Sequence, residues 1–302
     1  MTTSPVSPAV TVGVSQMDRY LFDLRGYLLL RGAIDPAHLV ELNAIIDAFD
    51  GLDPPLHHGE WYGGVLAHTF GGVDGMNLQH IYEAGEPFER LIDHPAWIGK
   101  VRHFVGGEGT FDHHHGPLFI DENFVSLRGP GEAIGLHSGG HTGAKRTQYR
   151  FHNGHFQCGQ INVLMALTEI GPGDGATMVV PGSHKANFPH PQSEEAAIKE
   201  GEATSVDGVE AAIEVHMEVG DVLLFVDAIN HGSSMRTNAG QRRICVYRYG
   251  PSWGMFRHPY RPTPAWLERL TEQRRRMVWP HAPTPRLPNR LSDMPSATES
   301  GM

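Results

Sequence analysis

The strongest constraint on the fold is a series of short apolar runs, separated by turn residues, that begins near residue 118. The runs cover residues 118–120, 123–127, 161–170, 176–180, 222–226 and 243–249. The chain has 36 Gly and 22 Pro, and turn signals such as Pro172-Gly173-Asp174-Gly175 lie between the runs. Many short strands joined by such turns are typical of an antiparallel sandwich or jelly roll. The sequence therefore predicts a mainly β fold.

Helices are expected on both sides of this β-rich region. Asp35 and Pro36 are a good N-cap and a good first helical residue, and apolar residues recur at helical spacing over residues 36–49. Further elements are expected at 26–31 (a strand), at 94–104 (a helix) and at 264–278 (a helix). The predicted fold class is mainly β with flanking helices, an α+β arrangement.

One domain is expected over residues 16–279. Residues 1–15 and 280–302 are rich in Ser, Thr or Pro and lack periodicity, so both are expected to be disordered tails. We find no internal repeat and no linker that would divide the middle of the chain.

The charge balance limits the partners. The formal charge is −10 at pH 7, whereas binding a nucleic-acid polymer needs a basic surface. No apolar stretch approaches the roughly 20 residues of a membrane span, and residues 1–15 do not resemble a secretory signal. A cytoplasmic protein that acts on a small molecule is the expectation. Cys158 and Cys245 fit no metal or redox spacing and are expected to be buried, reduced thiols, with one disulfide as the alternative.

Several motifs occur in an order that resembles a known family. They are Gly26-Tyr27-Leu28-Leu29-Leu30-Arg31, Pro172-Gly173-Asp174-Gly175-Ala176, Pro181-Gly182-Ser183-His184-Lys185, Gly220-Asp221-Val222-Leu223-Leu224-Phe225 and His231-Gly232-Ser233. Together they resemble the phytanoyl-CoA dioxygenase family over roughly residues 18–255. The resemblance implies a double-stranded β-helix (a cupin-like jelly roll) that binds Fe(II) and uses 2-oxoglutarate and O₂.

The resemblance also implies a metal site at His137 and His231. The family writes the first part of its metal motif as His-x-Asp, and this chain has His137-Ser138-Gly139 there. The usual ligand set is two His and one carboxylate on one face of the metal. Two further His-x-Glu strings, at 58–60 and 216–218, are attributed to chance in a chain with 20 His.

Gly139 in place of the carboxylate is similar to Fe(II)/2-oxoglutarate halogenases, which carry Gly or Ala at this position. Chloride can replace a carboxylate on the metal without changing the total charge, and a missing side chain leaves room for the ion. The leading hypothesis is therefore a halogenase that chlorinates an unactivated C–H bond of a small metabolite in specialised metabolism, such as antibiotic biosynthesis. His137, Gly139 and His231 would form its catalytic centre.

Three further residues are candidates for binding the co-substrate. Arg242 follows His231 at the spacing where the family places its 2-oxoglutarate arginine, and guanidinium matches a carboxylate with two parallel hydrogen bonds. A surface ion pair is the alternative for Arg242, and Arg243 should face the other side of the strand. Ser233 fits the family's His-x-Ser motif. Asn162 shares a strand face with Gln160 and either faces the site or forms a solvent-exposed polar edge.

A basic segment that follows the metal motif is interpreted as a lid loop. The segment contains His141, Lys145, Arg146, Arg150, His152 and His155. It is either a solvated loop or an anion-binding lid for a phosphorylated or carboxylated molecule such as a nucleotide. The tract His113-His114-His115 is expected to be solvated, and Trp61, Tyr62, Trp253 and Phe256 belong either to the pocket or to the core.

Two other functions stay open at this stage. One is a hydroxylase of the same family in which water, Asp227 or Glu169 completes the metal shell. The other is a non-catalytic binding protein that kept the fold and lost the metal.

Overall fold

The computed structural model describes residues 13–69, 75–106, 118–131, 133–192, 208–252, 254 and 262–279. Some features named in the sequence analysis lie outside the described residues: the tract His113-His114-His115, Trp253, Phe256 and the tail 280–302.

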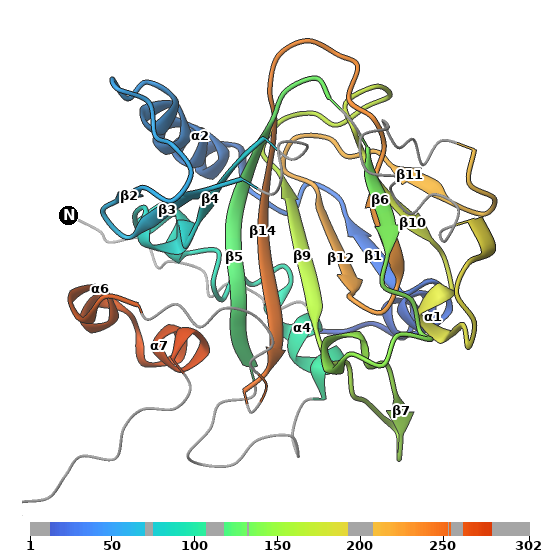
Figure 1. Ribbon diagram of the computed structural model, residues 1–302. Helices are drawn as coiled ribbons and strands as arrows, with labels where there is room; N and C mark the ends of the chain where they lie inside the picture. Colours follow the sequence, from blue (N-terminus) through green and yellow to red (C-terminus); the bar gives the residue numbers. More distant parts are fainter. Residues whose placement is uncertain are drawn as a thin grey trace, which may run out of the picture.

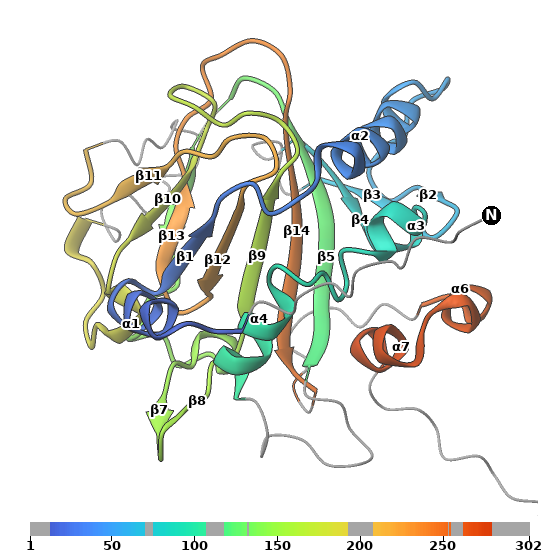
Figure 2. The same cartoon turned by 180° about the vertical axis from the view of Figure 1, so that it is seen from behind.

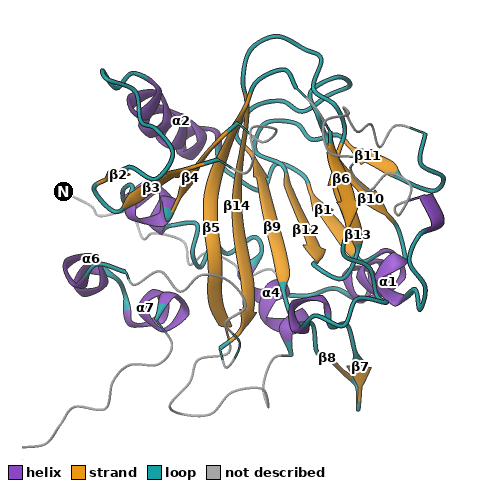
Figure 3. Ribbon diagram, viewed as in Figure 1, coloured by secondary structure: helices purple, strands orange, loops and turns teal. Residues whose placement is uncertain are grey.

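Two antiparallel sheets face each other, as predicted for a jelly roll (Figures 1 and 3). The large sheet has the strand order β1-β12-β9-β14-β5-β4-β3-β2. Its strands are β1 (Tyr27–Leu30), β2 (Trp61–Tyr62), β3 (Val65–His68), β4 (Met76–Gln79), β5 (Leu118–Arg128), β9 (Ile161–Ala166), β12 (Val222–Val226) and β14 (Arg242–Pro251). The small sheet has the order β11-β10-β13-β6. Its strands are β6 (Ile134–His137), β10 (Thr177–Val180), β11 (Ile213–Val215) and β13 (Asn230–Ser233). The mainly β fold class is confirmed, and the architecture is a double-stranded β-helix.

The predicted strands are close to the observed ones, with one informative difference. The runs 118–120 and 123–127 form a single strand, β5, although Asp121 and Glu122 lie between them. Both acids stay within the sheet because each has a partner: Gln160 Nε2 donates to Asp121 Oδ2 at 3.1 Å, and Arg248 donates to Glu122 Oε2 at 2.6 Å. Buried carboxylates are tolerated when they are paired in this way.

Helices cover the outer face of the large sheet (Figure 2). They are α1 (Gln16–Arg25), α2 (Pro36–Asp50), α3 (Glu86–Glu89) and α4 (Ile98–Val105), and α6 (Pro264–Arg269) and α7 (Glu272–Val278) follow β14. In α2 the Asp35 side chain accepts from Ala37 N at 2.8 Å, which confirms the predicted N-cap. The helix predicted at 94–104 begins at Ile98. The helix predicted at 264–278 is two helices, because Leu270 is extended and Thr271 caps a new N-terminus.

Helix α1, the large-sheet strands β2 to β4 and the small-sheet strands β6, β11 and β13 were not predicted. Helix α1 starts with a capping box, in which Asp18 N donates to Ser15 Oγ at 3.0 Å and Ser15 N donates to Asp18 Oδ2 at 2.9 Å. The sequence signal was Ser15 followed three residues later by an acid. The short strands β2 and β3 have weak signals on their own, and their pairing with β4 places them in the large sheet.

The core lies between the large sheet and its helices. Phe22 of α1 is fully buried and stacks on Phe104 of α4, with ring centroids 3.7 Å apart. Cys158 and Cys245 are both buried and neither forms a disulfide, as predicted. Within the described ranges, every helix is too short or too polar to cross a membrane.

Phe22→Ala should lower the free energy of unfolding by about 3–5 kcal/mol, because it removes a buried ring and leaves a cavity. Chemical denaturation followed by circular dichroism would measure this change. Tyr20→Ala, on the exposed face of the same helix, is the matched control and should change stability by about 0.5 kcal/mol or less. Equal losses in the two variants would contradict the placement of α1.

His184→Gln should make stability less dependent on pH. Burial lowers the pKa of His184 to about 4, whereas an unfolded His titrates near 6.5. The neutral ring is therefore favoured by folding, so its contribution is complete above about pH 6.5 and is lost as pH falls towards 4. The variant should reduce the pH slope of the unfolding free energy by up to about 1.4 kcal/mol per pH unit in this window. Above pH 7 the slopes of variant and parent should coincide in denaturant titrations.

Candidate active site

Two histidines face each other across the small sheet. Strands β13 and β6 pair antiparallel with His231 opposite His137, and the ring centroids lie 4.2 Å apart. In each ring Nδ1 lies within hydrogen-bond distance of the carbonyl oxygen two residues earlier: Gly135 at 3.0 Å for His137 and Ile229 at 2.7 Å for His231. A carbonyl only accepts, so each Nδ1 carries the proton and each Nε2 keeps its lone pair. This is the arrangement of a metal-ligating His held by a backbone carbonyl.

Both imidazoles are neutral at pH 7. Burial lowers the pKa of His231 to about 3, and the charge of His137 acts in the same direction. Desolvation by the surrounding groups also lowers the pKa of His137, although its side chain stays accessible to solvent at the end of β6. Metal binding needs the unprotonated ring, so protons do not compete strongly with a metal at this pair.

The histidine pair lines a cavity of about 300 Å³ between the two sheets. Along β14 the residues Arg242, Ile244, Val246 and Arg248 all line it, because alternate residues share one strand face. The two arginines therefore mark opposite ends of the cavity, which we name the Arg242 end and the Arg248 end. Apolar side chains, including Phe124, Leu164 and Phe225, line it as well.

The Arg242 end contains two buried arginines. Arg242 of β14 lies opposite Arg128 of β5, and the two are 5% and 1% exposed. Arg128 donates to Ser233 Oγ at 2.7 Å, and Arg242 donates to the carbonyl oxygen of Gly175. The alternative of a surface ion pair for Arg242 does not fit this burial. Arg243 faces the other side of the strand, as predicted, and pairs with Asp47 and Asp50 at 2.7 and 3.0 Å.

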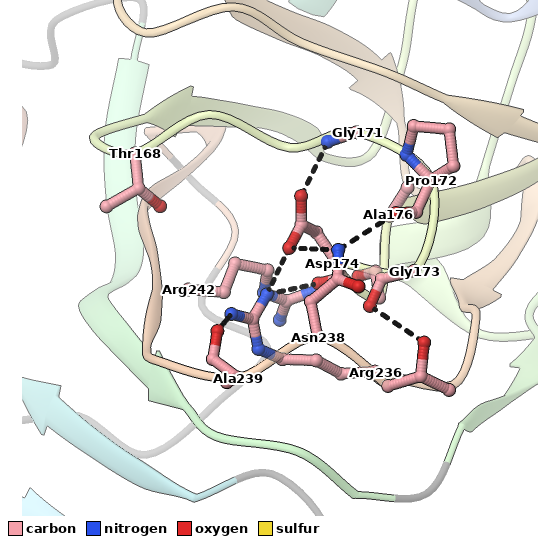
Figure 4. Close-up of polar contacts among 12 residues, drawn as sticks. Thr168, Gly171, Pro172, Gly173, Asp174, Ala176, Arg236, Asn238, Ala239 and Arg242 are labelled. Atoms are coloured by element: carbon pink, nitrogen blue, oxygen red, sulfur yellow. Dashed lines mark hydrogen bonds and ion pairs between the residues drawn. The ribbon is translucent and has the colours of Figure 1, made fainter.

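A tight turn holds the carbonyl that Arg242 contacts (Figure 4). The Asp174 carboxylate accepts from Gly171 N at 2.9 Å, from Arg236 at 2.8 Å and from Asn238 Nδ2 at 3.0 Å. Gly175 has a φ of +71°, and a Cβ there would lie 3.1 Å from the Arg236 Cβ. The Pro172-Gly173-Asp174-Gly175 motif therefore positions Arg242, which itself lines the cavity.

The Arg248 end contains a buried carboxylate, Asp227, which follows β12. Asn162 Nδ2 donates to Asp227 Oδ1 at 3.0 Å, and Arg146 Nε lies 3.4 Å from Asp227 Oδ2. Burial alone would raise the pKa of Asp227, but His231, Arg248, the Asn162 hydrogen bond and Arg146 outweigh it, so the pKa lies below its ordinary value. The second arginine of this end, Arg248, pairs with Glu122 at 2.6 Å.

Gly139 does not face the cavity. Ser138 and Gly139 have φ values of +67° and +117°, so the chain turns sharply away after β6. A Cβ on Gly139 would lie 2.7 Å from the His141 ring, and Gly139 lines a separate hollow with His141 and Asn230. The conformation at position 139 by itself favours glycine.

The remaining predicted residues are only partly brought together. Asn162 is 1% exposed and lines the cavity, so the alternative of a solvent-exposed edge does not apply. Glu169 is exposed and lies outside the cavity lining. In the His216-Met217-Glu218 string, His216 pairs with Glu214 at 2.7 Å. Across the described ranges, no three His, Cys, Asp or Glu side chains lie close enough together to hold a metal ion as they stand.

The lid segment contributes one side chain to the cavity. It leaves β6, forms a short 3₁₀ turn at Lys145–Thr147 and continues into the hairpin of β7 (Phe151–His152) and β8 (His155–Phe156). Of its basic residues, all within the described chain, Arg146 lines the cavity. His152 and His155 are exposed on the hairpin.

Arg128 was missed by the sequence analysis. Its signal was an Arg on the same face of a strand as Ser126 and Phe124, two positions that line the cavity. A basic residue at the end of a buried strand needs an anionic or carbonyl partner. The position of Arg128 at the end of an apolar run was therefore the signal that the sequence offered.

The chain belongs to the phytanoyl-CoA dioxygenase (PhyH) family, whose profile matches residues 22–244. A curated relative, the dioxygenase cdmD of Talaromyces verruculosus, is 33% identical over 104 residues. That match spans 34% of this chain and only 27% of the relative.

Solved structures support the fold. HygX from Streptomyces hygroscopicus, determined with nickel and 2-oxoglutarate bound, has a TM-score of 0.65 at 22% identity and covers 82% of this chain and 91% of its own. The epimerase SnoN from nogalamycin biosynthesis, described as non-haem and α-ketoglutarate dependent, has a TM-score of 0.52 at 16% identity and covers 77% of this chain and 81% of its own.

Proposed function

We propose that this protein is an Fe(II)- and 2-oxoglutarate-dependent oxygenase that hydroxylates a C–H bond of a small molecule. Family membership supports a non-haem iron oxidoreductase. The two similar structures were described with nickel and 2-oxoglutarate or as α-ketoglutarate dependent. A cavity of about 300 Å³ lies at the lower end of the usual range for small-molecule sites.

The residues fit a metal at the histidine pair. His137 and His231 present Nε2 atoms whose lone pairs are set by the Nδ1 contacts with Gly135 and Ile229. When bound, Fe(II) with 2-oxoglutarate activates O₂, so that the co-substrate loses CO₂ and the substrate C–H bond is oxidised. The protein's own part is to hold these groups and to exclude water with Phe124, Leu164 and Phe225.

The Arg242 end fits the remote carboxylate of 2-oxoglutarate. Arg242 lines the cavity next to Ser233, and guanidinium binds a carboxylate with two charge-assisted hydrogen bonds. Arg128 donates to Ser233 Oγ, so Ser233 is left to donate its own proton towards an anion. Buried cations of this kind are stabilised by an anionic ligand.

The placement of Gly139 is the observation that favours hydroxylation over chlorination. A side chain at 139 would point at His141 and into a separate hollow, so its absence opens no space beside the histidine pair.

Chlorination is the second candidate. As the side chains stand, the described residues place no third His, Cys, Asp or Glu at metal-binding distance from the histidine pair. This observation favours chlorination. A halide could then complete the shell. In that case the proposed cofactor set includes chloride, and the setting would be specialised metabolism, as for SnoN of nogalamycin biosynthesis.

A phosphorylated small molecule is the more specific proposal for the substrate. Arg146 reaches the cavity from the lid and Arg248 lines it from β14. Both already pair with carboxylates, Asp227 and Glu122, so an anionic substrate would share these cations rather than find them free.

Chloride should leave the co-substrate complex unchanged. Anaerobic protein with Fe(II) and 2-oxoglutarate should show the charge-transfer absorption band of the chelate, and titration with sodium chloride should shift neither the band nor the 2-oxoglutarate affinity. Sodium nitrate at equal ionic strength is the control. A chloride-specific shift with tighter 2-oxoglutarate binding would favour chlorination.

Arg242→Ala should weaken 2-oxoglutarate binding by roughly 100-fold, because two charge-assisted hydrogen bonds of about 1.5 kcal/mol each are lost. The same anaerobic band, titrated with 2-oxoglutarate, measures this. Arg243→Ala is the matched control, since Arg243 lies on the opposite strand face and pairs with Asp47 and Asp50. An unchanged affinity in Arg242→Ala would remove the Arg242 end as the co-substrate site.

A further inference from the structure

Asp227 lies at the Arg248 end of the cavity that the histidine pair also lines. Its backbone N–H donates to the carbonyl of Gln160 at 2.9 Å, which continues the pairing of β12 with β9 by one residue. Alternate residues share a strand face, so Asp227 faces the same side as Phe225. The Phe225 ring lies 4.8 Å from the His231 ring.

The carboxylate is buried and only half satisfied. Asp227 is 2% exposed. Its Oδ1 accepts a hydrogen bond from Asn162, whereas its Oδ2 is buried, accepts no hydrogen bond and has Arg146 Nε at 3.4 Å. A buried ionised oxygen without a hydrogen bond is costly. Such an atom, next to two His with free Nε2 atoms, suits a divalent cation.

Position 139, where the family usually has a carboxylate ligand, does not supply one here. Residue 139 is Gly, and its missing Cβ points at His141 rather than into the cavity. The cavity lining contains His137, His231 and Asp227 together. Two His and one carboxylate are the donor set of mononuclear non-haem Fe(II) sites.

We propose that Asp227 supplies the carboxylate ligand of the metal, in place of a side chain at position 139. The inference rests on the proposed function and assigns its third protein ligand. As the side chains stand, no three such groups within the described residues are close enough to bind a metal. Ligation therefore requires the Asp227 carboxylate to turn towards the histidines, with Oδ2 leaving Arg146 while Asn162 stays on Oδ1.

This assignment gives Asn162 a different role from the predicted one. Asn162 was expected to bond 2-oxoglutarate or chloride. Its Nδ2 atom instead donates to Asp227 Oδ1, so it is a positioning residue that holds the carboxylate by one oxygen. Such hydrogen bonds to ligating carboxylates orient them towards the metal.

The test is Mn(II) binding to the full chain, measured by isothermal titration calorimetry, because it needs no substrate and no turnover. Asp227→Ala should weaken Mn(II) binding by more than about 100-fold, beyond the roughly 10- to 100-fold loss for a residue that only supports a ligand. Asp227→Asn keeps the volume and should show the same loss if Asp227→Ala misfolds. Glu169→Gln, which removes an exposed carboxylate outside the cavity, should bind as the parent does.

A rescue experiment separates ligation from a structural role. Sodium formate should restore Mn(II) affinity in Asp227→Ala, because formate can occupy the space of the lost carboxylate, but it should not do so in His231→Ala. A loss below 100-fold, or no recovery with formate, overturns the assignment.

The result can be distinguished from failure of the proposed function. Normal Mn(II) binding in Asp227→Ala, together with 2-oxoglutarate consumption by the parent protein, removes Asp227 as a ligand and leaves the oxygenase intact. Strong Mn(II) loss in the variant, with no 2-oxoglutarate consumption by the parent, keeps the ligand and removes the oxygenase.

Discussion

The antiparallel pairing of β6 with β13 is the interaction on which the site depends. It places His137 opposite His231, and each ring is fixed by a carbonyl two residues earlier on its own chain. A one-residue slip would turn one of the histidines to the other face of the sheet. Ser233 lies two residues after His231, so it shares the cavity face of β13 and meets Arg128 of the large sheet. One short strand pair therefore sets both the position of the histidine pair and the link to the Arg242 end.

The cavity is organised by charge as well as by shape. At the Arg242 end two buried guanidinium groups contact a hydroxyl and backbone carbonyls. At the Arg248 end the arginines pair with Asp227 and Glu122. The first end thus presents two guanidinium groups, and at the second end each arginine lies beside a carboxylate. The proposed co-substrate site is the first end, and the histidine pair lies between the two ends.

Much of the fold and part of the site could be predicted from the sequence. The apolar runs predicted the large-sheet strands because buried strands are continuous apolar segments, and the order of the family motifs pointed to His137, His231, Ser233 and Arg242. Strands β2 and β3 were missed because they are short and are defined by pairing with β4 rather than by pattern. The direction of the missing side chain at Gly139 could not be predicted either, since it depends on the left-handed conformation of Ser138 and on the place of His141. Arg128 faces the cavity through strand register, which a linear sequence does not display, and the sequence offered Asp227 only as one of two carboxylates without a reason to prefer it over Glu169.

The lid segment is tied to the body by backbone hydrogen bonds near its two ends and by two aromatic side chains between them. The Tyr149 hydroxyl donates to Asp23 Oδ1, and the Phe156 ring is 3% exposed and packs edge-on against Phe22 and Phe104. Gly140 N donates to the carbonyl of Ser183 at 2.9 Å, and Cys158 N donates to the carbonyl of Phe104 at 3.1 Å. Between these points it contributes Arg146 to the cavity and presents an exposed hairpin. The exposed tip of the hairpin, residues 151–155, can therefore be exchanged or resized without disturbing the paired strands below it. Substrate range in proteins built on this plan should diverge first through the lid, while the strands beneath stay alike.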